Sequence, residues 1–350
     1  MNSKISAVPT NIITGFLGVG KTSTILQLFK HKPANERWAV LVNEFGEIGV
    51  DGALFAGQYS EQQGVFIREV PGGCMCCAAG VPMQIALNQL LLKAKPDRLF
   101  IEPTGLGHPK EVLTVLSKPH YQPVLNLQKT ITLVDARNLT NPRYTNHDTF
   151  NQQIAIADMV IGNKVDLYQK DDKSRLINYV KTHGHDNTEV LFAQHGEIHL
   201  AHLARNNTFA LSLLSATKHE HQHSTIEKTL IAQMPIPESG FIKAVNHGEG
   251  FTSIGWRFSA SKVFDHNKLQ GLLATINAER IKASCNTNHG RFSYNVTNEG
   301  LTQAPPMPEK TKAQTNNQES FIEVITFNLD KNTDNNLADI IEAQLLACIR

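Results

Sequence analysis

The first two hundred residues alternate between short apolar runs and segments with helical spacing. Continuous apolar runs are typical of strands buried on both faces of a parallel sheet. Apolar residues recur at helical spacing in 23–30 and in 81–93. Strands are predicted at Asn11–Thr14, Trp38–Asn43, Val65–Val70, Arg98–Glu102, Lys129–Asp135, from Met159 onward and at Val190–Ala193. This alternation predicts an α/β fold, with a mostly parallel sheet flanked by helices.

The pattern changes near Leu214. Residues 216–240 are polar, carry histidines and are broken by Pro235 and Pro237, which is typical of a linker. Strand-like runs follow at Phe241–Val245, Ser253–Phe258, Arg291–Val296 and Phe321–Phe327, with helical patterns at His266–Ala278 and Asn336–Cys348. We therefore predict a domain at 1–215, a linker at 216–240 and a smaller α+β domain at 241–350. The polar, proline-containing stretch 301–320 predicts a long mobile loop.

The strand at Asn11–Thr14 leads into a glycine-rich stretch that reads G-x-x-x-x-G-K-T, and a helical pattern follows it. This context is that of a P-loop, whose backbone N–H groups surround phosphates at a helix N-terminus. Lys21 would reach the β- and γ-phosphates, and the Thr22 hydroxyl would be a ligand of Mg²⁺. The predicted nucleotide contacts of this stretch are Gly15, Gly18, Val19, Gly20, Lys21, Thr22 and Ser23.

Two later strand ends carry acidic residues. The strand at Arg98–Glu102 ends in Glu-Pro-Thr-Gly, where Glu102 is predicted to hold or position water at the hydrolytic site and Gly105 to contact the γ-phosphate. The segment after Asn43 contains Glu44, Glu47 and Asp51, and it occupies the place of switch I. We predict that Asp51, or a nearby glutamate, approaches the Mg²⁺ directly or through water.

The run from Met159 ends in Asn163-Lys164-Val-Asp166, an N-K-x-D stretch. The carboxylate of Asp166 can accept from N1–H and the exocyclic amine of guanine, and adenine offers no such pair of donors. Asn163 can bind guanine or tie its own loop to the P-loop. Together with Lys164, these residues predict a preference for GTP over ATP. Ala193 or Gln194 is a weaker candidate to lie behind the base.

Three thiols follow the strand at Val65–Val70, in the sequence Gly-Gly-Cys74-Met-Cys76-Cys77. Thiolates are soft ligands that favour Zn²⁺ or Cu⁺, and the two glycines let the loop curl enough for the sulfurs to converge. We favour a Zn²⁺ site over a C-x-x-C redox pair or over inert small side chains. A fourth ligand would come from water, a client protein, or a side chain such as His108.

The other candidate residues are less specific. His219, His221 and His223 alternate within the linker and would bind metal transiently or serve only as solvated polar residues. Cys285 and Cys348 are isolated and are predicted to be buried structural residues. No arginine finger is evident, although Arg68, Arg98 and Arg137 have no assigned role, and slow intrinsic hydrolysis is therefore predicted.

Composition limits the classes of partner. The 350 residues carry a formal net charge of +1 with His neutral, which is no footprint for nucleic acid or an anionic membrane. No apolar run approaches a membrane span, and the first ten residues lack the apolar core of a signal peptide. We therefore expect a cytoplasmic protein with neither a nucleic-acid nor a membrane partner.

The order of these motifs resembles that of the CobW-type family of metal-handling P-loop GTPases, and within it the YeiR kind of zinc-binding GTPase. The similarity is dense over residues 10–200 and looser afterwards. It implies a GTPase that handles a transition metal for client proteins, and it assigns Lys21 and Thr22 to phosphate and Mg²⁺ and the three clustered cysteines to metal. Where the family's second domain usually reads R-V-K-G, this chain reads Arg280-Ile-Lys-Ala283, so a role that needs that glycine is in doubt.

The resulting prediction is a GTP-hydrolysing zinc metallochaperone that uses GTP, Mg²⁺ and Zn²⁺ and transfers metal to an unknown client metalloprotein. A client, or a second copy in a homo-dimer, would supply the missing help for hydrolysis. One alternative is a nucleotide-gated scaffold GTPase whose cysteines are structural or redox-active. A P-loop kinase or ATPase is a second alternative, which the N-K-V-D stretch disfavours.

Overall fold

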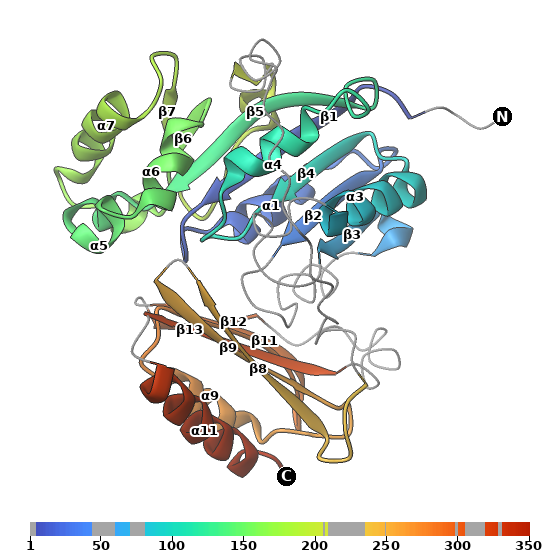
Figure 1. Cartoon of the computed structure of the whole chain (residues 1–350), viewed down its shortest axis with the longest axis vertical. Coiled ribbons are helices and arrows are strands. Elements are labelled where there is room, and N and C mark those ends of the chain that lie inside the picture. Colours follow the sequence, from blue (N-terminus) through green and yellow to red (C-terminus); the bar gives the residue numbers. More distant parts are fainter. Residues whose placement is uncertain are drawn as a thin grey trace. The chain divides into compact units, whose positions relative to one another are not determined.

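The structure, a computed structural model, describes residues 5–43, 60–70, 81–205, 207–208, 235–248, 250–297, 300–304, 319–327 and 331–350. These residues belong to two units, one ending at residue 208 and the other beginning at residue 235 (Figure 1). The predicted linker 216–240 falls mostly outside the described residues, so its bounds and those of the two predicted domains stay predictions.

Seven strands of the first unit form one parallel sheet in the order β3-β2-β4-β1-β5-β6-β7. Their bounds are Val8–Gly15 (β1), Trp38–Asn43 (β2), Val65–Val70 (β3), Arg98–Glu102 (β4), Leu125–Val134 (β5), Met159–Gly162 (β6) and Glu189–Phe192 (β7). The chain runs outward from β1 to β2 and β3, returns to β4 beside β1, and then continues on the other side with β5. The carboxyl ends around β1 therefore form the crevice where open α/β sheets bind ligands.

Apolar side chains pack on both faces of this sheet, as the continuous runs predict. Helices α3 (Val81–Ala94) and α4 (Pro109–Leu116) contribute Leu87, Leu90 and Leu113 to one buried cluster, which includes Ile12 of β1. Helix α1 (Lys21–Lys30) contributes Phe29, whose ring lies 6.0 Å from both the Trp38 and the Phe100 ring. The sheet therefore lies between two helical layers.

Several helices of the first unit were not predicted. Besides α4, they are α5 (Pro142–Thr145), α6 (Asp148–Ala155) and α7 (Asp172–His183), with short 3-10 turns η1 (Glu61–Gln63), η2 (Ala136–Thr140), η3 (Val165–Leu167) and η4 (Leu200–Leu203). The predicted strand at Lys129–Asp135 extends too far, because β5 ends at Val134. Asp135 instead caps η2 by accepting from the Arg137 backbone N–H at 3.2 Å.

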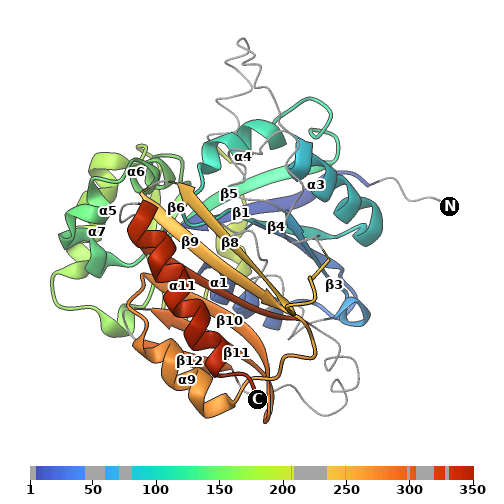
Figure 2. The same cartoon turned by 60° about the horizontal axis from the view of Figure 1, so that its bottom comes forward.

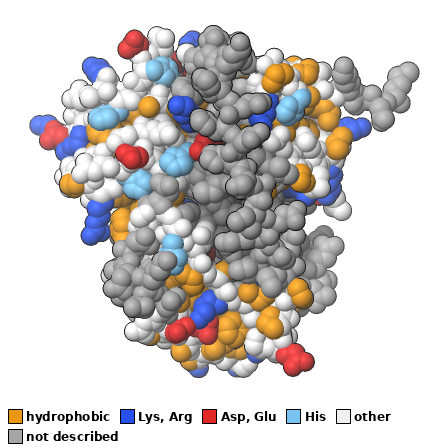
Figure 3. All heavy atoms as spheres, in the orientation of Figure 1, with side chains coloured by type: hydrophobic (Ala, Val, Ile, Leu, Met, Phe, Trp, Pro, Cys, Tyr) orange, Lys and Arg blue, Asp and Glu red, His pale blue; other side chains and the backbone are white. Residues whose placement is uncertain are grey.

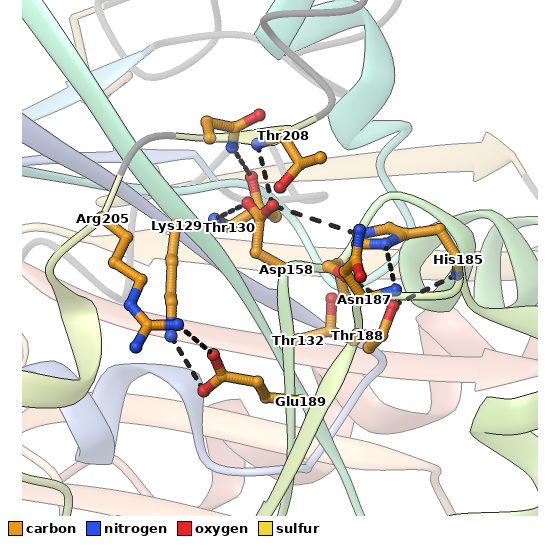
Figure 4. Close-up of polar contacts among 12 residues, drawn as sticks. Lys129, Thr130, Thr132, Asp158, His185, Asn187, Thr188, Glu189, Arg205 and Thr208 are labelled. Atoms are coloured by element: carbon orange, nitrogen blue, oxygen red, sulfur yellow. Dashed lines mark hydrogen bonds and ion pairs between the residues drawn. The ribbon is translucent and has the colours of Figure 1, made fainter.

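The amino ends of β5, β6 and β7 carry a network of polar groups, some of them buried (Figure 4). The carboxylate of Asp158 is 4% exposed and accepts from the backbone N–H groups of Thr130 (2.8 Å) and Thr208 (2.9 Å). Glu189 accepts from Lys129 at 2.9 Å and from Arg205 at 3.1 Å. Through these contacts, Arg205 and Thr208, near the end of the first unit, are bonded to the amino end of the sheet. The P-loop is at the carboxyl end.

The second unit contains a six-stranded antiparallel sheet in the order β12-β11-β10-β13-β9-β8. Its strands are Phe241–Gly248 (β8), Phe251–Phe258 (β9), Arg280–Thr287 (β10), Gly290–Thr297 (β11), Gly300–Ala304 (β12) and Ser320–Phe327 (β13). Helices α9 (His266–Thr275) and α11 (Lys331–Ala347) lie side by side on one face (Figure 2). Alternate residues of the strands, such as Ile254, Trp256, Ile281 and Val324, form the core beneath them.

Two strands of the second unit were not predicted. Strand β10 alternates polar and apolar residues from Arg280 to Cys285, a local strand signal that the sequence analysis did not use. The predicted loop at 301–320 is wrong at its start and at its end, because residues 301–304 belong to β12, which pairs with β11, and Ser320 begins β13. Ala283, which replaces the family's usual glycine, is fully buried in the core of this unit.

Charged side chains of both signs are visible on one face of the molecule (Figure 3). On the face shown in Figure 3, Lys and Arg side chains are interspersed with Asp and Glu and are not gathered in one patch. Among the described helices, none combines the length and the apolar character that crossing a membrane requires.

Candidate nucleotide site

The P-loop connects the carboxyl end of β1 to the first residue of α1. Gly15, Gly18 and Gly20 all have positive φ, at 140°, 72° and 99°. A Cβ on Gly15 would lie 2.4 Å from the Leu133 carbonyl oxygen, and one on Gly20 would lie 2.7 Å from Nδ2 of Asn163. These positions therefore require glycine both for backbone conformation and for space.

Lys21 and Thr22 begin α1 and are both buried, at 5% and 7% exposed. The Lys21 ammonium donates to the carbonyl oxygens of Gly15 (2.9 Å) and Phe16 (3.1 Å) and thus lies over the loop. The Thr22 hydroxyl donates to Oε1 of Glu102 at 2.8 Å. A P-loop hydroxyl and the acid at the end of β4 therefore meet, although 80 residues separate them.

This pair fits a magnesium ion. A hydroxyl and a carboxylate are hard oxygen donors, the ligand type that Mg²⁺ prefers, and they lie at the N-terminus of α1 where phosphates bind. Glu102 is 2% exposed, so its carboxylate is held in place by surrounding protein. Thr22 and Glu102 would hold the ion directly or through its water.

Residues 104–107 form a tight turn just after β4. The Gly107 N–H donates to the Thr104 carbonyl at 3.1 Å, and the Leu106 N–H donates to the Thr104 hydroxyl at 3.2 Å. A Cβ on Gly105 would lie 2.8 Å from Leu17 Cδ2 and 3.1 Å from the Lys21 Nζ. The structure thus brings the predicted γ-phosphate contact directly against the P-loop lysine.

Asn163 ties the N-K-x-D loop to the P-loop, one of the two roles considered from the sequence. It is 2% exposed; its Nδ2 donates to the Val19 carbonyl at 2.8 Å, and its Oδ1 accepts from the Gly196 N–H at 3.0 Å. Lys164 has a left-handed φ of 63°, and its Nζ lies 3.8 Å from Oδ2 of Asp135. Asp166 is exposed, so its carboxylate is accessible to a base.

Three features near the site were not predicted. Gly196, with φ 75°, packs on Thr24 of α1, and a glycine in the turn after the last apolar run was the signal for it. Phe16 in the P-loop forms edge contacts with the rings of Tyr144 and Phe150, with centroids 5.3 Å and 5.9 Å apart. Gln153 of α6 donates to the Gly105 carbonyl at 3.0 Å.

Ala193 is buried and Gln194 is exposed, so the role of either residue behind a base stays a prediction.

Three arginines left without a role now have partners. Arg137 pairs with Asp135, Arg68 donates to Gln89 of α3, and Arg98 donates to the Asn11 side chain at 3.2 Å. Arg98 begins β4, so it lies at the amino end of the sheet, away from the P-loop. None of these three donates to a residue of the P-loop in the contacts described above.

The predicted metal-binding cysteines lie outside the described residues, as do Glu44, Glu47, Asp51 and the histidines at 219, 221 and 223. Within the part of the chain that the structure describes, no group of three or more His, Cys, Asp or Glu is placed to hold a metal ion. His108 Nδ1 lies 3.0 Å from the Gln152 side chain. Cys285 and Cys348 are buried as predicted, and burial raises the pKa of the Cys285 thiol to about 12.

Comparison with known proteins agrees with these motifs. Residues 9–190 match the family model described as CobW/HypB/UreG, nucleotide-binding domain. The chain is 41% identical over 305 residues to the zinc chaperone YeiR of Escherichia coli, covering 85% of this chain and 90% of that protein. It is 26% identical over 246 residues to the zinc chaperone CobW of a Sinorhizobium species, covering 63% and 69%. With a P-loop, a buried acid at the end of β4 and an N-K-x-D loop on one parallel sheet, the chain belongs to the CobW/HypB/UreG family of P-loop GTPases.

Proposed function

We propose that this GTPase is a zinc metallochaperone, which binds Zn²⁺ as cargo and couples its binding and transfer to GTP. The observation that carries the nucleotide half is the assembly of three distant motifs by hydrogen bonds from Thr22 to Glu102 and from Asn163 to the P-loop. The zinc half is supported by the cluster of Cys74, Cys76 and Cys77 and by the similarity to proteins named zinc chaperones.

Each nucleotide contact follows from its position. Lys21 binds the β- and γ-phosphate oxygens, Thr22 is a ligand of Mg²⁺, and Glu102 positions water or the ion's hydration shell. Thr22 and Glu102 would hold Mg²⁺ directly or through its water, and the bound ion would supply positive charge that offsets the charge of the phosphates. Asp166 accepts hydrogen bonds from guanine, and Asn163 keeps its loop aligned with the phosphates.

The coupling to metal rests on where the chain leaves the sheet. β2 ends at Asn43 and β3 at Val70, both at the carboxyl edge that also carries the P-loop and Glu102. The segment with Asp51 and the segment with the three cysteines each begin there. Contacts of these segments with GTP and Mg²⁺ would order the cysteines and raise the affinity for zinc, and hydrolysis would release it to a client. By linkage, zinc must then favour the GTP state by the same factor.

Hydrolysis by the isolated chain is expected to be slow, because Arg68, Arg98 and Arg137 are engaged elsewhere. A client protein or a second copy of the chain would supply the missing positive charge. Clustered free thiols are stable in a reducing compartment, so we place the protein in the cytoplasm.

The test is a Co²⁺ titration followed by absorption spectroscopy, with GDP and then with a non-hydrolysable GTP analogue plus Mg²⁺. A thiolate-to-Co²⁺ charge-transfer band that strengthens with the analogue supports the proposal. Triple replacement of the clustered cysteines by Ser removes the band, whereas Cys348→Ala keeps it. Equal metal affinity in both nucleotide states rejects the coupling. Absence of any thiolate band leaves a GTPase with structural or redox cysteines.

A further inference from the structure

We propose that Gln153 is a positioning residue for GTP hydrolysis, which holds the turn at Gly105 against the P-loop. The inference rests on the proposed role of the Gly105 N–H as a contact of the γ-phosphate. It assigns a function to α6, a helix that carries none of the sequence motifs.

The side chain of Gln153 is fully buried and directed at the turn. Its Nε2 donates to the Gly105 carbonyl at 3.0 Å and lies 3.5 Å from the Gly107 carbonyl oxygen. The reverse orientation of the amide would place its oxygen against two carbonyl oxygens, so the hydrogen-bond environment assigns the orientation. One amide group thus serves two carbonyls of a four-residue turn.

The turn is held from its opposite side by the P-loop. A Cβ on Gly105 would lie 3.0 Å from the Leu17 backbone nitrogen and 3.1 Å from Lys21 Nζ, so the backbone there touches the loop. Gly105 has no side chain to restrict its dihedral angles. The Gln153 hydrogen bond to its carbonyl acts with the hydrogen bond from the Leu106 N–H to the Thr104 hydroxyl. Together they hold the peptide that directly follows the Gly105 N–H.

Contacts of helix α6 with the sheet and the P-loop fix the position of the Gln153 side chain. The backbone carbonyl of Gln153 accepts from the Thr132 hydroxyl on β5 at 2.6 Å. Phe150, one turn earlier, packs against Phe16 of the P-loop. The same helix therefore contacts the central sheet, the P-loop and the turn, so it fixes the distance between the two nucleotide-binding segments.

A glutamine at position 153 would lower the stability of the fold if its side chain served only for packing. Its Oε1 is buried and meets no hydrogen-bond donor among the described residues. A buried acceptor without a donor lowers stability, and an apolar side chain of similar size, such as Met, would avoid that cost. Retention of the amide fits a requirement for its donor at Gly105.

The experiment compares Gln153→Met and Gln153→Glu with the full-length protein, and uses Asn151→Ala as control. Asn151 is on the same helix, but its side chain bonds to Thr145 and Tyr179, away from the turn. We expect both Gln153 variants to lower the single-turnover rate of GTP hydrolysis by about tenfold or more, because positioning effects of this size follow small displacements. GDP affinity should stay within about twofold of the original protein, and N151A should hydrolyse GTP normally.

Hydrogen exchange of the peptide covering residues 102–108 gives a second readout. In the original protein these amides should exchange slowly with the GTP analogue, and in folded Gln153→Met they should exchange at least about tenfold faster. A normal hydrolysis rate in either folded variant overturns the proposal. A parallel loss of GDP affinity and hydrolysis overturns it as well, since that indicates a structural role. If neither variant folds, fast exchange of this peptide in the original protein with the GTP analogue is the overturning result.

These readouts are independent of zinc. If the Co²⁺ titration fails, the metallochaperone proposal fails while the effect on hydrolysis still stands. If the original protein hydrolyses no GTP under any condition, the proposed reaction itself fails.

Discussion

The two ends of the parallel sheet both carry buried polar groups, but these groups have different kinds of partner. At the carboxyl end, Lys21 is bonded to carbonyls of its own loop and Thr22 to Glu102. At the amino end, Asp158 accepts from backbone N–H groups of other segments, and Lys129 is paired with Glu189 (Figure 4). The polar groups at the carboxyl end belong to or contact a glycine-rich loop, whereas those at the amino end connect residues in or next to strands.

This difference separates function from stability. Phosphates and Mg²⁺ can replace the contacts that Lys21 and Thr22 make now, because a charged ligand competes well for an ammonium or a hydroxyl. No ligand is needed to satisfy Asp158, whose two donors belong to the fold. Substitutions at the carboxyl end should therefore change activity, and substitutions at the amino end should change the free energy of unfolding.

The largest effect is expected for Lys21→Ala. Removal of the ammonium should lower kcat/KM for GTP by about 10²–10³-fold, because this charge stabilises the phosphates and the transition state. The thermal unfolding temperature should change little, since Lys21 donates to carbonyl oxygens of a glycine-rich loop. Steady-state hydrolysis and calorimetry are the measurements. A variant with the original kcat/KM would contradict the assignment of the P-loop.

Asp166→Ala tests the base-binding part of the same end. We expect about 10²-fold weaker GTP binding with unchanged folding, because the exposed carboxylate is the group that distinguishes guanine from adenine. Asp171→Ala is the matched control, as Asp171 is also exposed and follows five residues later. ATP should displace bound GTP at a lower concentration in Asp166→Ala than in the original protein. Unaltered selectivity would show that the base binds elsewhere.

At the amino end, Asp158→Ala should destabilise the first unit by about 2–4 kcal/mol, because it leaves the buried N–H of Thr130 and the partly buried N–H of Thr208 without their acceptor. Hydrolysis per folded molecule should stay within about twofold of the original at low temperature. Urea unfolding measures the first quantity, and Asp186→Ala, which changes an exposed aspartate nearby, is the control. A loss of turnover without loss of stability would remove the distinction between the two ends.

The smallest effect is expected for Arg205→Ala. The Arg205 side chain is 78% exposed, and exposed ion pairs contribute little because solvent screens them. The free energy of unfolding should fall by less than about 0.5 kcal/mol. Lys129→Met, which removes the 7% exposed partner of the same glutamate, should cost more. Equal effects of the two variants in urea would show that burial does not govern this network.

Much of the first unit was predictable because its signals are local. Each of its strands appears where an apolar run predicts one, and the glycines of the P-loop have the positive φ that the motif requires. The helices α4, α6 and α7 were missed because their apolar faces are short and are stabilised by packing on the sheet. In the second unit, β10 was missed although Arg280–Cys285 alternates polar and apolar residues, so its local signal was present in the sequence.

The sequence by itself determined the order of the elements and the residue types of the site, since strand periodicity, glycine conformation and hydrogen-bonding capacity are properties of short segments. Only the tertiary structure decided which of two roles Asn163 has in this structure, that Thr22 meets Glu102, and that Gln153 reaches Gly105. These contacts join residues up to 144 positions apart. Their geometry depends on the strand order of the sheet, which no local pattern contains.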